Sequence, residues 1–206
     1  MRLNLITQFY IMTVNLIPEH IRKLYEIHEW KHACAILYND FPDEFNDIIS
    51  ILSAFKLYRS QMTVGGGGKS KISQSIDSEF YSRGWFEKSF ETKIVVDDKS
   101  IETPTHKVDC YRNNIAVEIE WSNKDPFYDR DLNNFRLLFD LRAISVGVII
   151  TKSDELRKVM EKIGVWKKYG TSTTWMKKLL PRIEGGGGGG CPILVFGITP
   201  QLYIED

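Results

Sequence analysis

Apolar residues recur along this chain with two different periods, and the two periods predict different elements. A spacing of three to four residues, typical of one buried helix face, runs through residues 18–37, 43–55, 72–82, 129–141, 154–169 and 173–180. Short continuous or alternating apolar runs, typical of strands, cover residues 3–7, 93–96, 107–111, 115–121, 145–151 and 192–198. We therefore expect helices and strands to follow one another along the chain.

This order of elements predicts an α/β domain in which helices flank a mixed central sheet. The 206 residues are 43% hydrophobic and 26% charged, which is ordinary for a globular protein that builds its own core. Nothing in the pattern indicates a second core. We expect one domain over residues 1–206, with a helical N-terminal part in 1–60 and the main core in 65–200.

Charge and cysteine content narrow the possible partners and compartment. The 27 basic and 27 acidic residues balance, so global charge gives no sign of nucleic acid or anionic membrane as a partner. A local basic tract does occur in residues 152–182. Cys34, Cys110 and Cys191 lack metal-ligand spacing and indicate buried free thiols in a reducing compartment. The short apolar N-terminus lacks a cleavage site, and no stretch approaches a membrane span, so we expect a soluble intracellular protein.

The segment 107–120 carries the strongest chemical signal, because it reads as a hairpin that gathers three acids. Asn113 and Asn114 suit a two-residue turn, since asparagine tolerates the positive φ of tight hairpins. Closure there places Asp109 opposite Glu118, with Glu120 further along the same face. The opposite face would then be apolar: Val108, Cys110, Ile115, Val117 and Ile119. Facing acids repel one another, and a divalent metal is the simplest way to offset that repulsion.

Two other interpretations of the same hairpin stay open at this point. Exposed strand faces often carry glutamate, and Lys107 could neutralise Glu120 as an ordinary cross-strand pair. A turn of three or four residues would shift the register of Asp109 and disperse the acids.

Glycine runs and histidines suggest other chemistry but fit it poorly. The stretch Gly65 to Ser70 resembles a phosphate-binding loop, yet Thr63 stands where the first glycine is required and no buried strand precedes it, so a flexible connector is favoured. The six glycines of 185–190 are likewise interpreted as a mobile surface connector. His28 and His32 share a predicted helix face, and we treat them as surface residues.

The acid pattern, read with its flanks, resembles the PD-(D/E)xK nuclease fold. More narrowly, it looks like the BglII/BstYI group of Type II restriction endonucleases, with a BamHI-like acidic site. The matching residues are Asp109, then Glu118 nine residues later in the strand 117–123, followed by a helix and the apolar strand 146–152. Segments 81–85 and 192–198 look like landmarks of the group, and the resemblance covers roughly residues 65–200.

The resemblance implies roles for the three acids. Asp109 and Glu118 would ligate Mg²⁺, together with the backbone carbonyl of Ile119. Glu120 stands where the fold usually has lysine; a carboxylate there cannot stabilise charge on a phosphate, but it can ligate a second metal or orient the attacking water. The catalytic residues implied are therefore Asp109, Glu118 and Glu120.

The resemblance also implies contacts to double-stranded DNA. Ser122 and Asn123 match positions from which such enzymes contact bases. Candidates for contacts to phosphates or to further base edges are Lys124, Lys69 and Lys152, the basic tract 152–182, and the hydroxyls of 171–174, including Thr173.

The implied activity is Mg²⁺-dependent, site-specific double-strand cleavage of a short, palindromic DNA sequence in the cytoplasm of a prokaryotic cell. A two-fold target calls for a homodimer, with its interface on the helices of 17–59 or of 129–144, and a cognate DNA methyltransferase is expected in the same cell. The alternatives are a DNA-binding protein that has lost turnover, which the glutamate at 120 keeps open, and a repair or transposon nuclease of the same fold.

Overall fold

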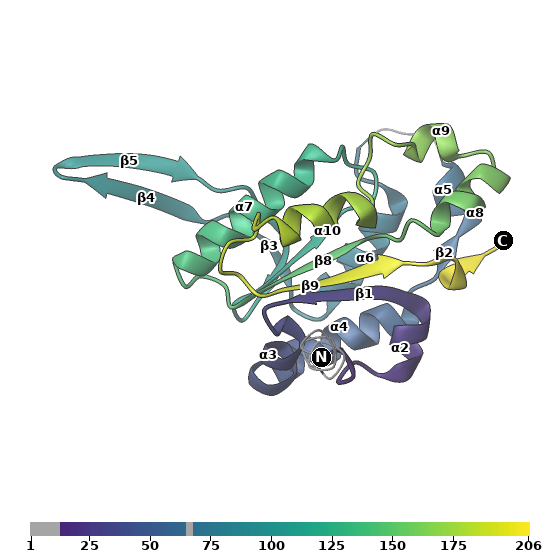
Figure 1. Ribbon diagram of the computed structural model, residues 1–206, viewed down its shortest axis with the longest axis horizontal. Coiled ribbons are helices and arrows are strands. Elements are labelled where there is room, and N and C mark those ends of the chain that lie inside the picture. Colours follow the sequence, from purple (N-terminus) through teal and green to yellow (C-terminus); the bar gives the residue numbers. More distant parts are fainter. Residues whose placement is uncertain (1–12, 65–67) are drawn as a thin grey trace, which may run out of the picture.

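A mixed sheet flanked by helices forms the centre of the computed structural model, which describes residues 13–64 and 68–206 (Figure 1). Within those ranges six strands make the central sheet, in the order β1-β9-β8-β7-β6-β3. Strands β9, β8 and β7 are parallel, and the other neighbouring pairs are antiparallel. The strands are β1 (Tyr25–Trp30), β3 (Phe86–Lys88), β6 (Val108–Arg112), β7 (Ile115–Ile119), β8 (Val146–Lys152) and β9 (Ile193–Ile198). The α/β prediction is thus confirmed. The short strand expected at 3–7 lies outside the described residues.

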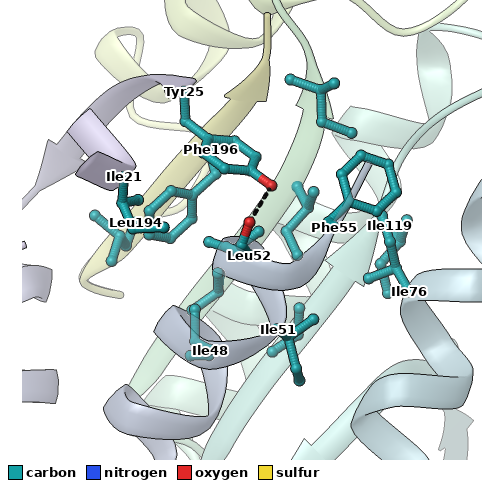
Figure 2. Close-up of a cluster of buried hydrophobic side chains, with 14 of the residues drawn as sticks. Ile21, Tyr25, Ile48, Ile51, Leu52, Phe55, Ile76, Ile119, Leu194 and Phe196 are labelled. Carbon is teal, nitrogen blue, oxygen red and sulfur yellow. Dashed lines mark hydrogen bonds between the residues drawn. The ribbon is translucent and has the colours of Figure 1, made fainter. Parts of the chain in front are cut away.

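Two hydrophobic clusters cover the two faces of this sheet. One joins β1 and the inner strands to α2 (Glu19–Leu24), α3 (Ala33–Asp40), α4 (Pro42–Ala54) and α6 (Lys71–Ser82). Figure 2 shows part of it, where the hydroxyl of Tyr25 donates to the carbonyl of Leu52 at 2.9 Å. The other packs the opposite face against α7 (Pro126–Asp140) and α10 (Met176–Glu184).

Burial on both faces explains why β8 is apolar at nearly every position. Val148 and Ile150 belong to one cluster and Ile149 to the other. Gly147 has no side chain because an added Cβ would lie 2.4 Å from the ring of Phe135 on α7. The prediction of a doubly covered central strand is confirmed.

The predicted hairpin forms with the predicted turn. Asn113 and Asn114 both have positive φ, at 42° and 63°, and the register pairs Arg112 with Ile115 and Cys110 with Val117. One position on its apolar face differs from prediction: Val108 packs in the other cluster, beside Tyr111 and α7.

A shift in strand pairing accounts for that difference. Tyr111 pairs with Phe86 of β3 and Val108 with Lys88, so β6 advances three residues while β3 advances two. The extra residue of β6 lies at Asp109 or Cys110, and such bulges commonly redirect side chains beside functional sites.

The long helix predicted for 18–37 is wrong. Instead α2 ends at Leu24, β1 pairs antiparallel with β9, and α3 begins after Lys31 and His32, which both have positive φ. His28 therefore lies on a strand and His32 at a helix start, not on one helix face. The apolar spacing of this segment fits either element, and pairing with β9 decides for the strand.

Several other boundaries also differ. Asp43 lies in the first turn of α4 rather than capping it. The helix predicted for 154–169 divides into α8 (Leu156–Lys162) and α9 (Trp166–Tyr169), because Gly164 takes φ +76° between them. The helix predicted from residue 173 begins only at Met176.

A two-stranded ribbon, β4 (Glu91–Val96) and β5 (Lys99–Pro104), extends away from the body of the protein (Figure 1). The sequence predicted only the first of its strands. The remaining elements are β2 (Leu57–Tyr58), α5 (Arg59–Thr63), the 3-10 helix η1 (Pro200–Leu202) and β10 (Tyr203–Ile204), with β2 and β10 paired in parallel.

The glycine run 185–190 is a packed turn, so its interpretation as a mobile connector is wrong. A Cβ at Gly188 would lie 2.4 Å from Ile193, and one at Gly189, which has φ +56°, would lie 2.5 Å from Arg136. At Gly188 and Gly189, therefore, β9 and α7 leave no space for a side chain, and Gly186 adopts a φ of +87° that favours glycine. In the earlier run, residues 65–67 lie outside the described ranges.

No helix in the described ranges combines the length and apolar character needed to cross a membrane.

Candidate active site

The three predicted acids come together where β6 begins and β7 ends. Asp109 holds the end of β7: its Oδ2 accepts from the backbone N–H of Ile119 at 3.0 Å, and its own N–H faces Glu118 Oε2 at 3.4 Å. The hydroxyl of Tyr81, from α6, donates to the carbonyl of Asp109 at 3.1 Å. The hairpin register has therefore placed Asp109 beside Glu118, as predicted.

Glu118 and Glu120 are almost fully buried, with 1% of each residue exposed. Burial, and then the charges of Asp131 and Asp109, raise the pKa of Glu118 well above its ordinary value. Burial and the charge of Asp131 also raise the pKa of Glu120, although Asn123 donates to its Oε1 at 2.9 Å. Both carboxylates are thus held where their negative charge is costly.

A fourth acid, Asp131 in the first half of α7, joins this group and was missed in the sequence. It is fully buried, and burial raises its pKa even though Arg130 Nη2 lies 2.7 Å from its Oδ1. The same guanidinium lies 3.8 Å from Glu120 Oε1 and stacks over Phe127 at 4.2 Å. The signal that would have indicated it is an aspartate at the spacing of the apolar stripe of a predicted helix, four residues before Phe135.

Lys69, which directly precedes the N-cap of α6, and Asp77, in the middle of that helix, complete the cluster on the side of β6. The Lys69 ammonium lies 2.5 Å from Asp77 Oδ2 and 3.0 Å from Asp109 Oδ1. Burial raises the pKa of Asp77 to about 6, against the lowering effect of Lys69. Asp77, like Asp131, interrupts an apolar helix stripe and was missed.

The residues present suit a divalent cation. Glu118 Oε1, Glu120 Oε2 and Asp131 Oδ2 are buried without a hydrogen-bond partner, and carboxylate oxygens are the ligands that Mg²⁺ prefers. Among the described residues, however, no three His, Cys, Asp or Glu side chains are already grouped to hold a metal. Asp109 is instead occupied by Lys69 and by the Ile119 N–H. Use of the Ile119 carbonyl as a ligand stays a prediction.

A cavity of about 310 Å³ opens over this cluster and is lined by Lys69, Asp109, Glu120, Ser122 and Asn123, among others. Ser122 is exposed at its edge, whereas the amide of Asn123 is directed to Glu120. Just beyond it, exposed Lys124 reaches Ser172 Oγ at 3.1 Å. These side chains lie where a substrate entering the cavity would contact them.

Two predicted contact residues are in positions that do not allow the predicted role. Lys152 is fully buried, and its ammonium donates to the carbonyl of Trp121 beneath the sheet surface, so it offers no cation to a phosphate. Thr173 is 4% exposed and its hydroxyl donates to the carbonyl of Tyr169 at 2.9 Å. Both were predicted from their place in a basic or hydroxyl-rich stretch, which does not reveal the direction of a side chain.

The ordinary cross-strand pair between Lys107 and Glu120 is not formed. Lys107 instead lies 2.9 Å from Glu87 on β3, at the other edge of the hairpin. Glu120 is therefore left to Arg130 and Asn123.

A mixed sheet that carries buried acids at the end of a hairpin, beneath an open cavity, is the organisation of a PD-(D/E)xK phosphodiester hydrolase. Residues 25–198 match the family model described as restriction endonuclease BglII/BglIII. The chain therefore belongs to the BglII/BglIII family of restriction endonucleases, as the resemblance predicted, and membership implies site-specific cleavage of DNA. No curated protein sequence matches it.

Proposed function

We propose that this chain is a Mg²⁺-dependent Type II restriction endonuclease that makes double-strand cuts in a short palindromic DNA sequence. The observation that carries the proposal is the set of buried, unpartnered carboxylate oxygens on Glu118 and Glu120, next to Asp109. Burying several acids side by side is costly unless a cation joins them. A protein that only bound DNA would gain nothing from that cost.

Asp109 and Glu118 would hold the metal, with the Ile119 carbonyl as a backbone ligand. Bound there, Mg²⁺ would activate a water molecule and offset the negative charge that develops on the phosphate. Glu120, fixed by Asn123, would orient that water or ligate a second ion. Arg130 holds Asp131 and Glu120 together and limits their mutual repulsion.

DNA would approach across the mouth of the cavity. Ser122 and Asn123 would contact base edges, and Lys69 and Lys124 would contact phosphates. Lys152 and Thr173 are buried and do not reach this interface. The enzyme would act in the cytoplasm of a prokaryotic cell, where a cognate methyltransferase protects the host DNA.

Cleavage of both strands of a palindrome calls for a homodimer with two-fold symmetry. The two segments predicted for the interface adjoin one another: a groove of about 530 Å³ is lined by Ile36 and Asp40 of α3 and by Phe139 and Asp140 of α7. Tyr38 and Leu141 nearby are 46% and 54% exposed. Analytical ultracentrifugation of Leu141→Asp beside the unaltered protein would test this surface: we expect a monomer, and an unchanged dimer would place the interface elsewhere.

The activity is tested by incubating the purified protein with a long DNA of known sequence, with Mg²⁺ or with EDTA. Glu118→Gln keeps the size of the side chain and removes its charge, and Glu19→Gln on the surface of α2 is the matched control. Discrete fragments that require Mg²⁺ and persist only in the control variant are expected, and sequencing their ends would give the recognition site. Binding without cleavage would favour the inactive DNA-binding alternative. Cuts scattered along the DNA would favour a repair or transposon nuclease.

A further inference from the structure

The Lys69 ammonium occupies the side of the acid cluster that faces α6. It bridges Asp77 and Asp109 at 2.5 and 3.0 Å, and Asp109 Oδ1 makes no other hydrogen bond or ion pair with the described residues. The second oxygen of Asp109 is already bound to the N–H of Ile119. For Asp109 to ligate a metal through Oδ1, Lys69 must therefore first leave it.

The backbone of Lys69 is held by hydrogen bonds, while its side chain is accessible. Its carbonyl accepts from the side chain of Gln74 at 2.7 Å, and the next residue, Ser70, caps α6 by accepting from the N–H of Ser73. The side chain itself is 38% exposed and lines the cavity over the acids. The ammonium can therefore move from the carboxylates into the cavity without any change in the backbone.

Strand β7 and the residue after it supply no cation to the site, because Glu120 stands at the position where the fold usually has lysine. Lys69 comes from another element but lines the same cavity as Glu120. A phosphate undergoing attack is stabilised by a cation close to its free oxygens. Lys69 is placed to supply the charge that the strand lacks.

We propose that Lys69 and the divalent metal exchange at Asp109, and that the released ammonium then contacts the scissile phosphate. This proposal rests on the proposed function, and it adds the exchange with metal at Asp109 and the scissile phosphate as the one that Lys69 contacts. In the metal-free protein Lys69 neutralises Asp77 and Asp109; once metal is bound, it becomes a group that touches the substrate.

If Lys69 and the metal exchange, removal of Lys69 should strengthen Mg²⁺ binding and slow cleavage. In Lys69→Met the competing ammonium is gone, so Mg²⁺ is expected to bind the DNA-free protein about tenfold more tightly, the size of one charged contact. Cleavage at saturating Mg²⁺ is expected to slow by at least about tenfold, because the phosphate loses its cation. A residue with a merely structural role would weaken both.

The test is isothermal titration of Mg²⁺ into the full chain without DNA, followed by single-turnover cleavage of the long DNA. Lys71→Met is the matched control for affinity, because it removes the same charge two residues away, from an exposed side chain that lines a neighbouring cavity. Tighter Mg²⁺ binding in Lys69→Met but not in Lys71→Met supports the exchange. Equal or weaker binding in Lys69→Met overturns it.

The two halves of the proposal can fail separately. Unchanged cleavage by Lys69→Met at saturating Mg²⁺ would overturn the phosphate contact while leaving the exchange in place. If the unaltered protein cleaves nothing, the proposed function and the phosphate contact both fall, and the titration still decides whether Lys69 competes with metal at Asp109.

Discussion

Replacing Lys152 with methionine should stabilise the protein, and the gain should depend on pH. The ammonium is fully buried between the rings of Trp121 and Trp175, at 5.2 and 5.0 Å, and donates to the carbonyl of Trp121. Burial lowers the pKa of Lys152 from 10.5 to about 7, with the charge of Glu120 acting in the opposite direction. Methionine has a similar length and no charge to desolvate.

The magnitude follows from that pKa. A fall from 10.5 to about 7 corresponds to roughly 5 kcal/mol lost by the folded state at pH values where the folded and the unfolded chain both carry the proton. Methionine leaves the Trp121 carbonyl without its donor, which costs about 1–3 kcal/mol. The expected net gain at pH 7 and below is therefore about 2–4 kcal/mol.

The pH dependence has a definite sign. Below pH 7 both folded and unfolded chains carry the proton on Lys152, and the advantage of the variant is at its largest. Between pH 7 and 10.5 the unfolded chain binds more protons than the folded one, so the unaltered protein gains stability as pH rises. The advantage of Lys152→Met should then shrink, by up to about 1.4 kcal/mol for each pH unit.

Urea unfolding of both proteins at pH 6.5 and pH 9, with EDTA present, measures this difference. Lys158→Met, which removes an exposed lysine from α8, controls for the change in net charge. An advantage that is equal at both pH values would show that the buried lysine does not titrate as argued. A variant less stable than the unaltered protein at both would mean that the Trp121 contact outweighs desolvation.

Three further predictions follow from the acid cluster and the glycine turn. Glu118→Gln should raise the unfolding free energy of the metal-free protein by about 1–2 kcal/mol at pH 8 and leave it unchanged near pH 4. The reason is the raised pKa of Glu118, which makes ionisation of this buried group destabilising as pH rises. Thermal melts at the two pH values check this, and equal shifts in melting temperature would contradict it. The affinity for Mg²⁺ should rise at least about tenfold from pH 6.5 to pH 8.5, because the metal needs Glu118 and Glu120 ionised and the pKa values of both are raised. Calorimetry at the two pH values measures this affinity. An affinity that does not change with pH would exclude these acids as ligands. Gly188→Ala should lower the unfolding free energy by about 1–3 kcal/mol through overpacking against Ile193, whereas equal stability in urea would mean that the turn yields.

The acidic hairpin could be predicted from the sequence because its causes are local. Two asparagines define the turn, the turn defines the register, and the register places Asp109 beside Glu118. The bulge in β6 was not predicted, because it depends on the pairing with β3, and no local sequence pattern predicts that strand.

The element that failed most clearly, β1, fails for the opposite reason. Residues 25–30 carry apolar side chains at positions that fit a helix or a strand equally well, and the choice is made by β9, which lies more than 160 residues further along the chain. Whether a side chain points into the core or into solvent also depends on residues far away in the sequence. Lys152 follows an apolar strand as a surface lysine might, yet the rings of Trp121 and Trp175 enclose it.

The positions of the cations in the site could not be predicted from the acid motif alone. In the sequence, Glu120 directly follows β7 and stands in place of the usual lysine, which adds a negative charge close to Glu118. In space, Lys69, from the segment just before α6, lies against Asp109, and Arg130, on α7, lies against its neighbour Asp131 and against Glu120. The balance of charge at the site is therefore a property of how α6 and α7 pack on the sheet. Substitutions in those two helices should alter metal binding as strongly as substitutions in the strand itself.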